Sequence, residues 1–185
     1  MSKPAISVIR YSRFFSMRHV RTVLDYGAGT LRNALYLVEQ GFEVYAADVP
    51  EQVKVLQAHP DVGTLAGLLE IGELTRNRLG VDLVLSTYVF NIIVTKEQRR
   101  RYLDNVVANL GRGGYLLMEV NCRLEELACG TAFHHYWDCD DKARSYTHEE
   151  LDRLLSPYGF KRICHYYTTH ALAAVYQLAD SDVVK

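Results

Sequence analysis

The stretch Val23-Leu-Asp25-Tyr-Gly27-Ala28-Gly29-Thr-Leu31-Arg32-Asn33 decides the fold of this 185-residue chain. An apolar run ends at an acidic residue, two glycines follow, and apolar residues then recur at helical spacing. Glycines permit a tight turn and let the backbone approach a ligand closely. Asp48 ends a second apolar run nineteen residues after Gly29, at a position where a carboxylate can accept hydrogen bonds from a ribose diol. This order of parts predicts a nucleoside-binding turn between a strand and a helix.

Strand and helix patterns alternate along the rest of the chain. We expect strands over 20–25, 43–48, 63–70, 81–86 and 114–120, and helices over 31–40, 51–58, 95–110 and from 147 to about 156. The apolar runs 160–167 and 171–178 are close enough in sequence to form a hairpin. The pattern predicts an α/β fold: a Rossmann-like, seven-stranded, mostly parallel sheet with an antiparallel C-terminal hairpin and helices on both faces. A ligand would bind at the switch point between the first and fourth strands.

Length and composition are typical of one globular domain over residues 1–185, with an N-terminal helical arm over 1–19 and a lid insertion over 121–146. The net charge of −1 gives no overall attraction to nucleic acid or membrane. The arm is nevertheless basic, since Lys3 and four arginines precede the first acidic residue, Asp25. No apolar run is long enough to span a bilayer, no secretory signal is apparent, and four cysteines suit reduced thiols, so we expect a cytoplasmic protein.

Two common nucleotide-binding motifs are not matched. A dinucleotide-binding turn would have a third glycine at position 32, where this chain has Arg32. A phosphate-binding loop would need Gly-Lys-Ser or Gly-Lys-Thr, which does not occur here. The turn therefore suits a different nucleoside cofactor.

A further set of residues carries a resemblance to a known family. They are Asp25-Tyr-Gly-Ala-Gly29, Arg32-Asn33-Ala-Leu-Tyr-Leu37, Gly41-Phe-Glu-Val44, Ala47-Asp48, Val81-Asp-Leu-Val-Leu-Ser-Thr87 and Gly113-Gly114. In this order they resemble the class I S-adenosylmethionine-dependent methyltransferases, and within that class the tellurite-resistance and thiopurine-type enzymes, over residues 22–120. The resemblance implies S-adenosylmethionine as the cofactor.

The resemblance also implies roles for individual residues. Gly27, Ala28 and Gly29 would let the backbone approach the methionine part of the cofactor. Its amino group would lie near Asp25, which could instead simply order the turn, and Asp48 would bind the ribose. The remaining implied cofactor-binding residues are Arg32 and Asn33 at the cofactor carboxylate, Val49 next to Asp48, Glu70 and Ile71 at the adenine edge, and Ser86 near the reactive centre. The Ser86 hydroxyl could equally form a hydrogen bond with the backbone instead of contacting a ligand.

Leu31 departs from the family, which commonly has glycine at this position. Its side chain would either fill the core or crowd the methionine pocket. The second alternative would leave a non-catalytic member of the family.

The acceptor side gives weaker signals. After the fourth strand the chain reads Ser86-Thr-Tyr88-Val-Phe90-Asn91, without the Asn/Asp-Pro-Pro-aromatic loop that enzymes methylating exocyclic base nitrogens share. Tyr88 could line an acceptor pocket, and His134 or His135 in the lid could take a proton. The Cys/His spacing around these histidines lacks the paired C-x2-C typical of structural zinc, so we expect no metal site.

These patterns favour methyl transfer to a small-molecule acceptor by in-line displacement, since the chain has no separate substrate domain. Nucleic acid is a less favoured partner. The alternatives are an RNA or protein methyltransferase that docks through the basic arm, and a non-catalytic protein that binds S-adenosylmethionine and regulates. The acceptor atom and the oligomeric state do not follow from the sequence.

Overall fold

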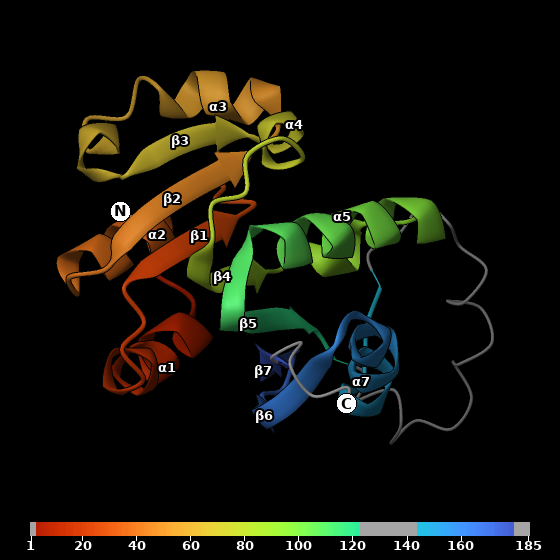
Figure 1. Ribbon diagram of the computed structural model, residues 1–185. Coiled ribbons are helices and arrows are strands. Elements are labelled where there is room, and N and C mark those ends of the chain that lie inside the picture. The colour runs from red at the N-terminus through yellow and green to blue at the C-terminus, as the bar shows by residue number, and fades with distance from the viewer. Residues whose placement is uncertain (1–2, 123–143, 180–185) are drawn as a thin grey trace.

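The computed structural model describes residues 3–122 and 144–179, and its centre is a seven-stranded sheet with the order β3-β2-β1-β4-β5-β7-β6 (Figure 1). Strands β1 to β5 pair in parallel, and β7 pairs antiparallel with both β5 and β6. The expected Rossmann-like sheet with an antiparallel C-terminal hairpin is therefore confirmed. The strands are β1 (Thr22–Tyr26), β2 (Glu43–Asp48), β3 (Gly67–Glu70), β4 (Val81–Thr87), β5 (Leu110–Asn121), β6 (Phe160–Tyr167) and β7 (Ala171–Leu178).

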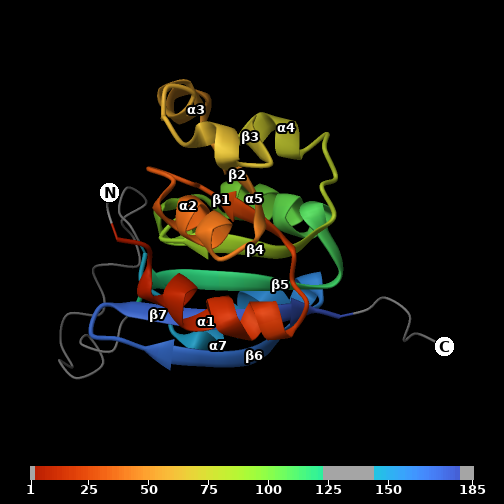
Figure 2. The same cartoon turned by 90° about the vertical axis from the view of Figure 1, so that its left-hand side faces the viewer.

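Helices cover both faces of this sheet. Residues of α1, α2 and α3 share one buried apolar cluster, and residues of α4, α5 and α7 share the other. Figure 2 looks onto the layer of α1 and α2, with α5 and α7 on the far side of the sheet. The helices are α1 (Ile6–Met17), α2 (Arg32–Glu39), α3 (Pro50–Leu56), α4 (Ile71–Leu74), α5 (Lys96–Asn109) and α7 (His148–Leu155).

The central strands are apolar along their length because both faces of the sheet are covered. In β1, Val23 faces the α1/α2 layer and Leu24 faces the α5/α7 layer, and both are fully buried. The same alternation runs through β5, where Leu117 and Met118 face opposite layers. This alternation decides which polar side chains meet at the edge of the sheet.

Some element boundaries differ from the expected ones. The fifth strand begins at Leu110, which pairs with Val81 ahead of an irregularity in register, instead of at residue 114. Gly114 therefore lies within the strand, where a Cβ atom would come 2.9 Å from the Gly111 carbonyl oxygen. The third strand occupies only 67–70 of the expected 63–70, and the short helix α4 was not expected. Three single turns of 3-10 helix, Val62–Thr64, Phe90–Ile92 and Ser156–Tyr158, also lie between the expected elements.

The predicted start of the last helix is confirmed. The Thr147 side chain accepts a hydrogen bond from the Glu150 amide, and the Glu150 carboxylate accepts one from the Thr147 amide, as in a capping box. Arg162 on β6 holds α7 through two hydrogen bonds of 2.9 Å, from Nε to Oδ1 and from Nη2 to Oδ2 of Asp152. Most of the proposed lid insertion lies outside the described residues, including His134 and His135.

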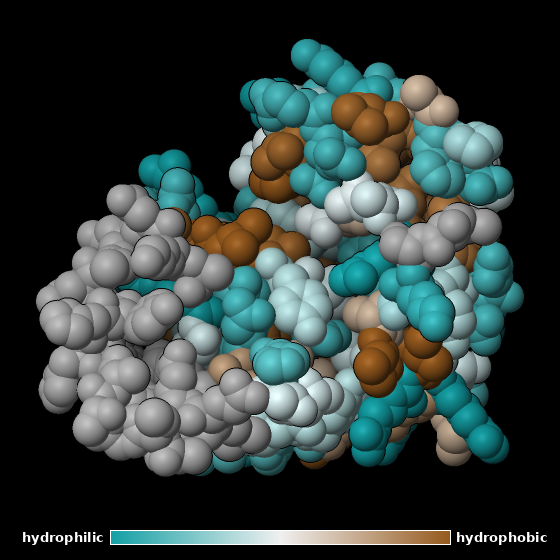
Figure 3. Space-filling model, turned by 180° about the vertical axis from the view of Figure 1, so that it is seen from behind, coloured by the Kyte–Doolittle hydropathy of each residue, from teal (hydrophilic) through white to brown (hydrophobic). Residues whose placement is uncertain are grey.

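None of the helices in the described part of the chain combines the length and apolar character that crossing a bilayer requires. Viewed from behind in Figure 3, hydrophobic residues form patches separated by hydrophilic ones. The two described cysteines, Cys122 and Cys164, are free, and the described residues contain no group of three metal-ligating side chains.

Candidate functional site

The glycine turn follows β1 at the edge where the parallel strands end. The Gly27 and Ala28 amides donate to the Ala47 carbonyl at 2.8 and 3.1 Å, which fixes the turn against the end of β2. Gly27 has φ +89, and a Cβ atom there would lie 2.3 Å from a methyl carbon of Val89. Gly29 has φ +56 with nothing within 4 Å of an added Cβ atom, so its exposed backbone faces open space. Gly29 therefore presents accessible backbone at this edge, whereas the Gly27 and Ala28 amides are already used within the protein.

Leu31 lies immediately before α2 in the left-handed conformation that glycine adopts most easily, with φ 61 and ψ 10. Its side chain is completely buried in the apolar cluster of the α1/α2 layer. Of the two alternatives that the sequence left open, the structure shows the first, in which the side chain fills the core.

Asp48 holds the glycine turn from the neighbouring strand. Its Oδ2 atom accepts a hydrogen bond from the Gly29 amide at 2.7 Å, and its Oδ1 atom accepts one from the Val49 amide at 2.8 Å. Gln52 of α3 donates to the Gly29 carbonyl at 2.5 Å. A carboxylate has about four lone-pair positions, so each oxygen of Asp48 keeps acceptor capacity toward a ligand.

Asp25 is fully buried at the end of β1, and neither carboxylate oxygen has a partner with ordinary hydrogen-bond geometry. Burial, followed by the nearby negative charge of Asp48, raises the pKa of Asp25 from 3.8 to about 7, while the Ala34 backbone amide and Arg32 act in the opposite direction. A buried carboxylate without a partner is costly, so a cation delivered beside it would be stabilised. The position suits the ammonium group that the resemblance places there, although full burial puts Asp25 behind the turn surface.

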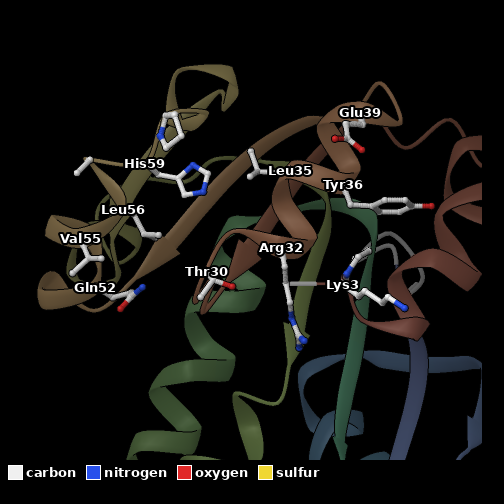
Figure 4. Close-up of a pocket in the computed structure, with 13 residues that line it drawn as sticks. Lys3, Thr30, Arg32, Leu35, Tyr36, Glu39, Gln52, Val55, Leu56 and His59 are labelled. Carbon is white, nitrogen blue, oxygen red and sulfur yellow. The ribbon is translucent and has the colours of Figure 1, made fainter. Parts of the chain in front are cut away.

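Asn33 connects three segments, with both ends of its side-chain amide used inside the protein. Its Oδ1 atom accepts from the Ala5 amide at 2.8 Å, and its Nδ2 atom donates to the Thr87 hydroxyl at 2.9 Å. Arg32 instead lines one end of an open groove of about 720 Å³ between α2 and α3. Figure 4 shows Arg32 and Lys3 toward one end of this groove and His59 toward the other. Its lining comes from α2, α3 and the segments beside them, so the groove adjoins the glycine turn through Thr30 and Arg32 without reaching the ends of β4 and β5.

Glu70 and Ile71 lie at the end of β3, next to Asp48 in the sheet register. The Glu70 side chain caps α4, and the Glu70 amide donates to Glu73 Oε2 at 2.7 Å. Ile71 is half-buried against the apolar cluster of the α5/α7 layer. Both residues therefore lie at the same edge of the sheet as Asp48, and the carboxylate of Glu70 already has a structural role.

Ser86 and Tyr88 have different surroundings. Ser86 is completely buried beside Tyr102 of α5, on the sheet face away from the glycine turn's helix. Tyr88 has φ 58, and its amide donates to the Glu119 carbonyl at 2.7 Å. Burial and the Glu119 carboxylate both raise the pKa of the Tyr88 hydroxyl, which therefore stays protonated. The structure thus brings Tyr88 to the site edge and takes the Ser86 hydroxyl away from it.

The sequence reasoning missed Glu119, a buried carboxylate near the end of β5 that is 5% exposed. The signal was available, because an acidic residue interrupts the otherwise apolar run of β5 from Tyr115 to Val120. Its partner Ser7 on α1, which donates a hydrogen bond to Glu119 Oε2, could not be found from local patterns.

Comparison with known proteins adds a family and a fold. The family described as tellurite resistance protein TehB matches residues 15–154, which is most of the chain. A comparison with curated proteins finds no significant match.

Solved structures of methyltransferases share the fold. A SAM-dependent methyltransferase from Methanosarcina mazei has a TM-score of 0.73 and 15% identity, with 97% of this chain and 100% of that chain covered. The 1,6-didemethyltoxoflavin-N1-methyltransferase of Burkholderia thailandensis, with its acceptor and S-adenosylhomocysteine bound, has a TM-score of 0.67 and 19% identity, covering 95% and 79%. Magnesium protoporphyrin IX methyltransferase of Synechocystis PCC 6803, with S-adenosylhomocysteine bound, has a TM-score of 0.70 and 15% identity, covering 94% and 82%. At these identities the likeness shows the fold alone, and that fold is the one class I methyltransferases use.

Proposed function

We propose, since this chain belongs to the family described as tellurite resistance protein TehB, that it binds S-adenosylmethionine and transfers the methyl group to a small-molecule acceptor. The observation that carries the proposal is the contact between the glycine turn and Asp48. The Asp48 carboxylate accepts a hydrogen bond of 2.7 Å from the Gly29 amide, at the end of two adjacent parallel strands. The turn and the carboxylate therefore form one surface. This is the arrangement of backbone and acid that a nucleoside cofactor needs at a switch point.

The described residues fit this cofactor. Asp48 keeps lone pairs for the ribose hydroxyls, and charge-assisted hydrogen bonds to a carboxylate are short and strong. Gly29 offers open backbone next to it, and Val49 is 46% exposed beside the same carboxylate. Ile71 would contact the adenine, and Glu70, whose side chain caps α4, would hold the backbone in place beside it. When bound, the cofactor supplies a methyl group on a sulfonium, which is the electrophile of the reaction.

The other proposed cofactor residues have narrower roles. Arg32 is half-buried and extends from the start of α2, where it suits the cofactor carboxylate. The Asn33 amide is satisfied within the protein, and the Ser86 hydroxyl is buried beside Tyr102 on the other face of the sheet, so we propose that both residues hold the walls of the site instead of contacting the cofactor. Asp25 would stabilise the cofactor's ammonium group through the electric field.

The small size of the acceptor is supported by the architecture. All described elements belong to a single sheet and the helices that cover it. Two structural neighbours are named as methyltransferases of small molecules, 1,6-didemethyltoxoflavin and magnesium protoporphyrin IX. Docking of RNA through the arm is less favoured, because two of its arginines already stack on aromatic rings of the protein. The guanidinium of Arg10 lies 4.4 Å from the ring centroid of Tyr166, and the guanidinium of Arg18 lies 5.4 Å from the ring centroid of Phe14.

Isothermal titration calorimetry with S-adenosylmethionine and S-adenosylhomocysteine tests the cofactor part of the proposal. We expect wild-type protein to bind both, and Asp48→Ala to lose about 100-fold in affinity, which is about 3 kcal/mol for two charge-assisted hydrogen bonds. The matched control is Glu51→Ala, which removes an exposed carboxylate from the first turn of α3.

The control variant is expected to bind both ligands like the wild type. Unchanged affinity in Asp48→Ala would contradict the ribose assignment. Failure of wild-type protein to bind either ligand would contradict the proposed function as a whole, including the non-catalytic alternative.

A further inference from the structure

Three polar side chains lie in one row across the sheet near the site edge. In the register, Thr87 of β4 is opposite Glu119 of β5, Glu119 is opposite Ala173 of β7, and Ala173 is opposite Tyr166 of β6. Glu119 follows Tyr115 and Leu117 at alternate positions, and both of these belong to the apolar cluster of the α1/α2 layer. Since side chains alternate along a strand, Glu119 points to that same layer. Thr87 connects the row to the start of α2 through Asn33.

Glu119 is a buried carboxylate whose described partners are hydroxyl groups. Ser7, which is fully buried on α1, donates to its Oε2 atom. None of the ion pairs found among the described residues involves Glu119. Burying a carboxylate is costly unless hydrogen-bond donors surround it, so its remaining lone pairs favour a ligand that brings a proton.

Two tyrosines face this carboxylate. The negative charge of Glu119 contributes to raising the pKa of both Tyr88 and Tyr166, after the larger effect of burial. The Tyr166 ring is held in place by Arg10, whose guanidinium carbon lies 4.4 Å from the ring centroid, and by Tyr11, at 5.9 Å between ring centroids. The other charged group that acts on Tyr88 is Arg32. Two tyrosines therefore flank the carboxylate, with Arg10 against the ring of Tyr166 and the charge of Arg32 acting on Tyr88.

We infer that Glu119, flanked by Tyr88 and Tyr166, binds the proton of the acceptor's nucleophilic atom, and that the acceptor is a small aromatic compound bearing an N–H or O–H group. This inference rests on the proposed methyltransferase function. The acceptor's lone pair forms the new bond to the methyl carbon as the carbon–sulfur bond breaks, and the electron pair of that bond stays on sulfur. The acceptor's proton goes to the Glu119 carboxylate. Charge balances, because the sulfonium becomes a neutral thioether and the carboxylate becomes a neutral acid.

A purely structural role is the competing explanation, in which Glu119 only anchors α1 through Ser7. The variant Glu119→Gln separates the two, because the glutamine amide oxygen can still accept the Ser7 hydroxyl while the negative charge is lost. Ser7→Ala does the reverse by removing the anchor and leaving the carboxylate. Proton acceptance by Glu119 predicts an effect of its negative charge, whereas a purely anchoring role predicts an effect of removing the Ser7 hydroxyl.

The test uses 4-nitrophenol as the probe, since its phenolate absorbs visible light and its phenol does not. Absorbance is followed against pH with the probe bound to protein saturated with S-adenosylhomocysteine. A carboxylate beside the bound hydroxyl disfavours the phenolate, so we expect the apparent pKa of the bound probe to be at least about one unit higher in wild type than in Glu119→Gln, a tenfold difference in ionisation. Ser7→Ala should retain the wild-type value.

The control is Asp82→Asn, which makes the same kind of change at a carboxylate at the opposite end of β4, where it accepts hydrogen bonds from Arg21 and Thr22. This variant should bind and ionise the probe like wild type. Equal probe pKa values in wild type and Glu119→Gln, or no binding of the probe to wild type, would overturn the inference. Calorimetry of S-adenosylhomocysteine with the same samples distinguishes this outcome from failure of the proposed function, because loss of cofactor binding concerns only the latter.

Discussion

Leu31 combines an unfavourable backbone with a favourable side chain. A non-glycine residue in the left-handed region, here with φ 61, costs about 1–2 kcal/mol. A fully buried leucine contributes more than this, because truncation to alanine in a core costs about 2–5 kcal/mol. The packing term is the larger, so the leucine is retained where the family commonly has glycine. The two terms can be separated because they respond differently to truncation.

We predict that Leu31→Gly is more stable than Leu31→Ala, by about 1 kcal/mol, although glycine removes more atoms. Both variants lose the packing of the leucine, but only glycine relieves the strained backbone. Both should be less stable than wild type. The measurement is the free energy of unfolding from urea denaturation, with the slope checked for equality among the three proteins.

Leu37→Ala and Leu37→Gly provide the comparison. Leu37 is also buried in the same cluster, but it lies within α2, where glycine is worse than alanine by about 1 kcal/mol. The order of the pair should therefore reverse at this position. A glycine variant less stable than the alanine variant at both positions would show that the left-handed backbone at Leu31 carries little strain.

Among the elements, α1 is joined to the carboxyl ends of two central strands by buried polar contacts. Asn33 links the Ala5 amide to the Thr87 hydroxyl, at 2.8 and 2.9 Å, and Ser7 contacts Glu119. The arm, which the sequence predicted as a basic helical segment, is therefore docked by its first turn next to the site. Its outer face remains exposed, including Ile6 and Arg13.

We predict that Asn33→Ala loosens the first two turns of α1 and destabilises the protein by about 1–3 kcal/mol. The change leaves the Ala5 amide and the Thr87 hydroxyl without their partner, and an unsatisfied buried polar group carries a cost of that size. Native-state hydrogen exchange should show the largest loss of protection at the start of α1, beyond the change in global stability.

Asn105→Ala is the matched control, since Asn105 donates a single hydrogen bond of 3.2 Å to the Tyr26 hydroxyl on the other face of the sheet. It should leave protection of α1 unchanged relative to the rest of the molecule. A uniform loss of protection across all elements in Asn33→Ala would contradict a local role of Asn33 in holding the start of α1.

The elements also show how far the sequence determines the arrangement. Alternation of strands and helices predicted the sheet, and it brought the ends of β1 and β2 together, because parallel strands share an edge. It could not determine which side chains of β4 and β5 face which layer, since a shift of one residue moves a side chain to the other face. For this reason Ser86 was expected near the site although it faces Tyr102, and Glu119 was overlooked. Glu70 ends β3, where the third strand was expected to end, but its capping role depends on α4, which is too short to give a periodic signal.

For the molecule as a whole, Asp25 is the group whose burial couples folding to pH near neutrality. Its folded pKa of about 7 exceeds the ordinary value of 3.8, so the folded state holds this proton more tightly than the unfolded state does. The free energy of unfolding should therefore fall as pH rises between these two values, by at most about 1.4 kcal/mol per pH unit, and level off above about pH 7. Asp82 and Asp152 have lowered pKa values, so the stability they contribute is lost only as pH falls below the ordinary value for aspartate.

We predict that Asp25→Asn removes the downward slope and is more stable than wild type above neutral pH. Asparagine keeps the shape of the side chain but has no charge to bury.

His165 acts in the opposite direction. Its pKa is lowered by burial and by His148, so the stability it contributes is lost as pH falls through the ordinary value for histidine. The difference between the wild-type and Asp25→Asn unfolding curves cancels this histidine term. Urea denaturation at intervals from pH 4 to pH 8 measures that difference, and Asp82→Asn should keep the wild-type slope in the same range. Parallel curves for wild type and Asp25→Asn would show that Asp25 stays ionised in the folded protein, with a counter-charge supplied from within the chain before any cofactor binds.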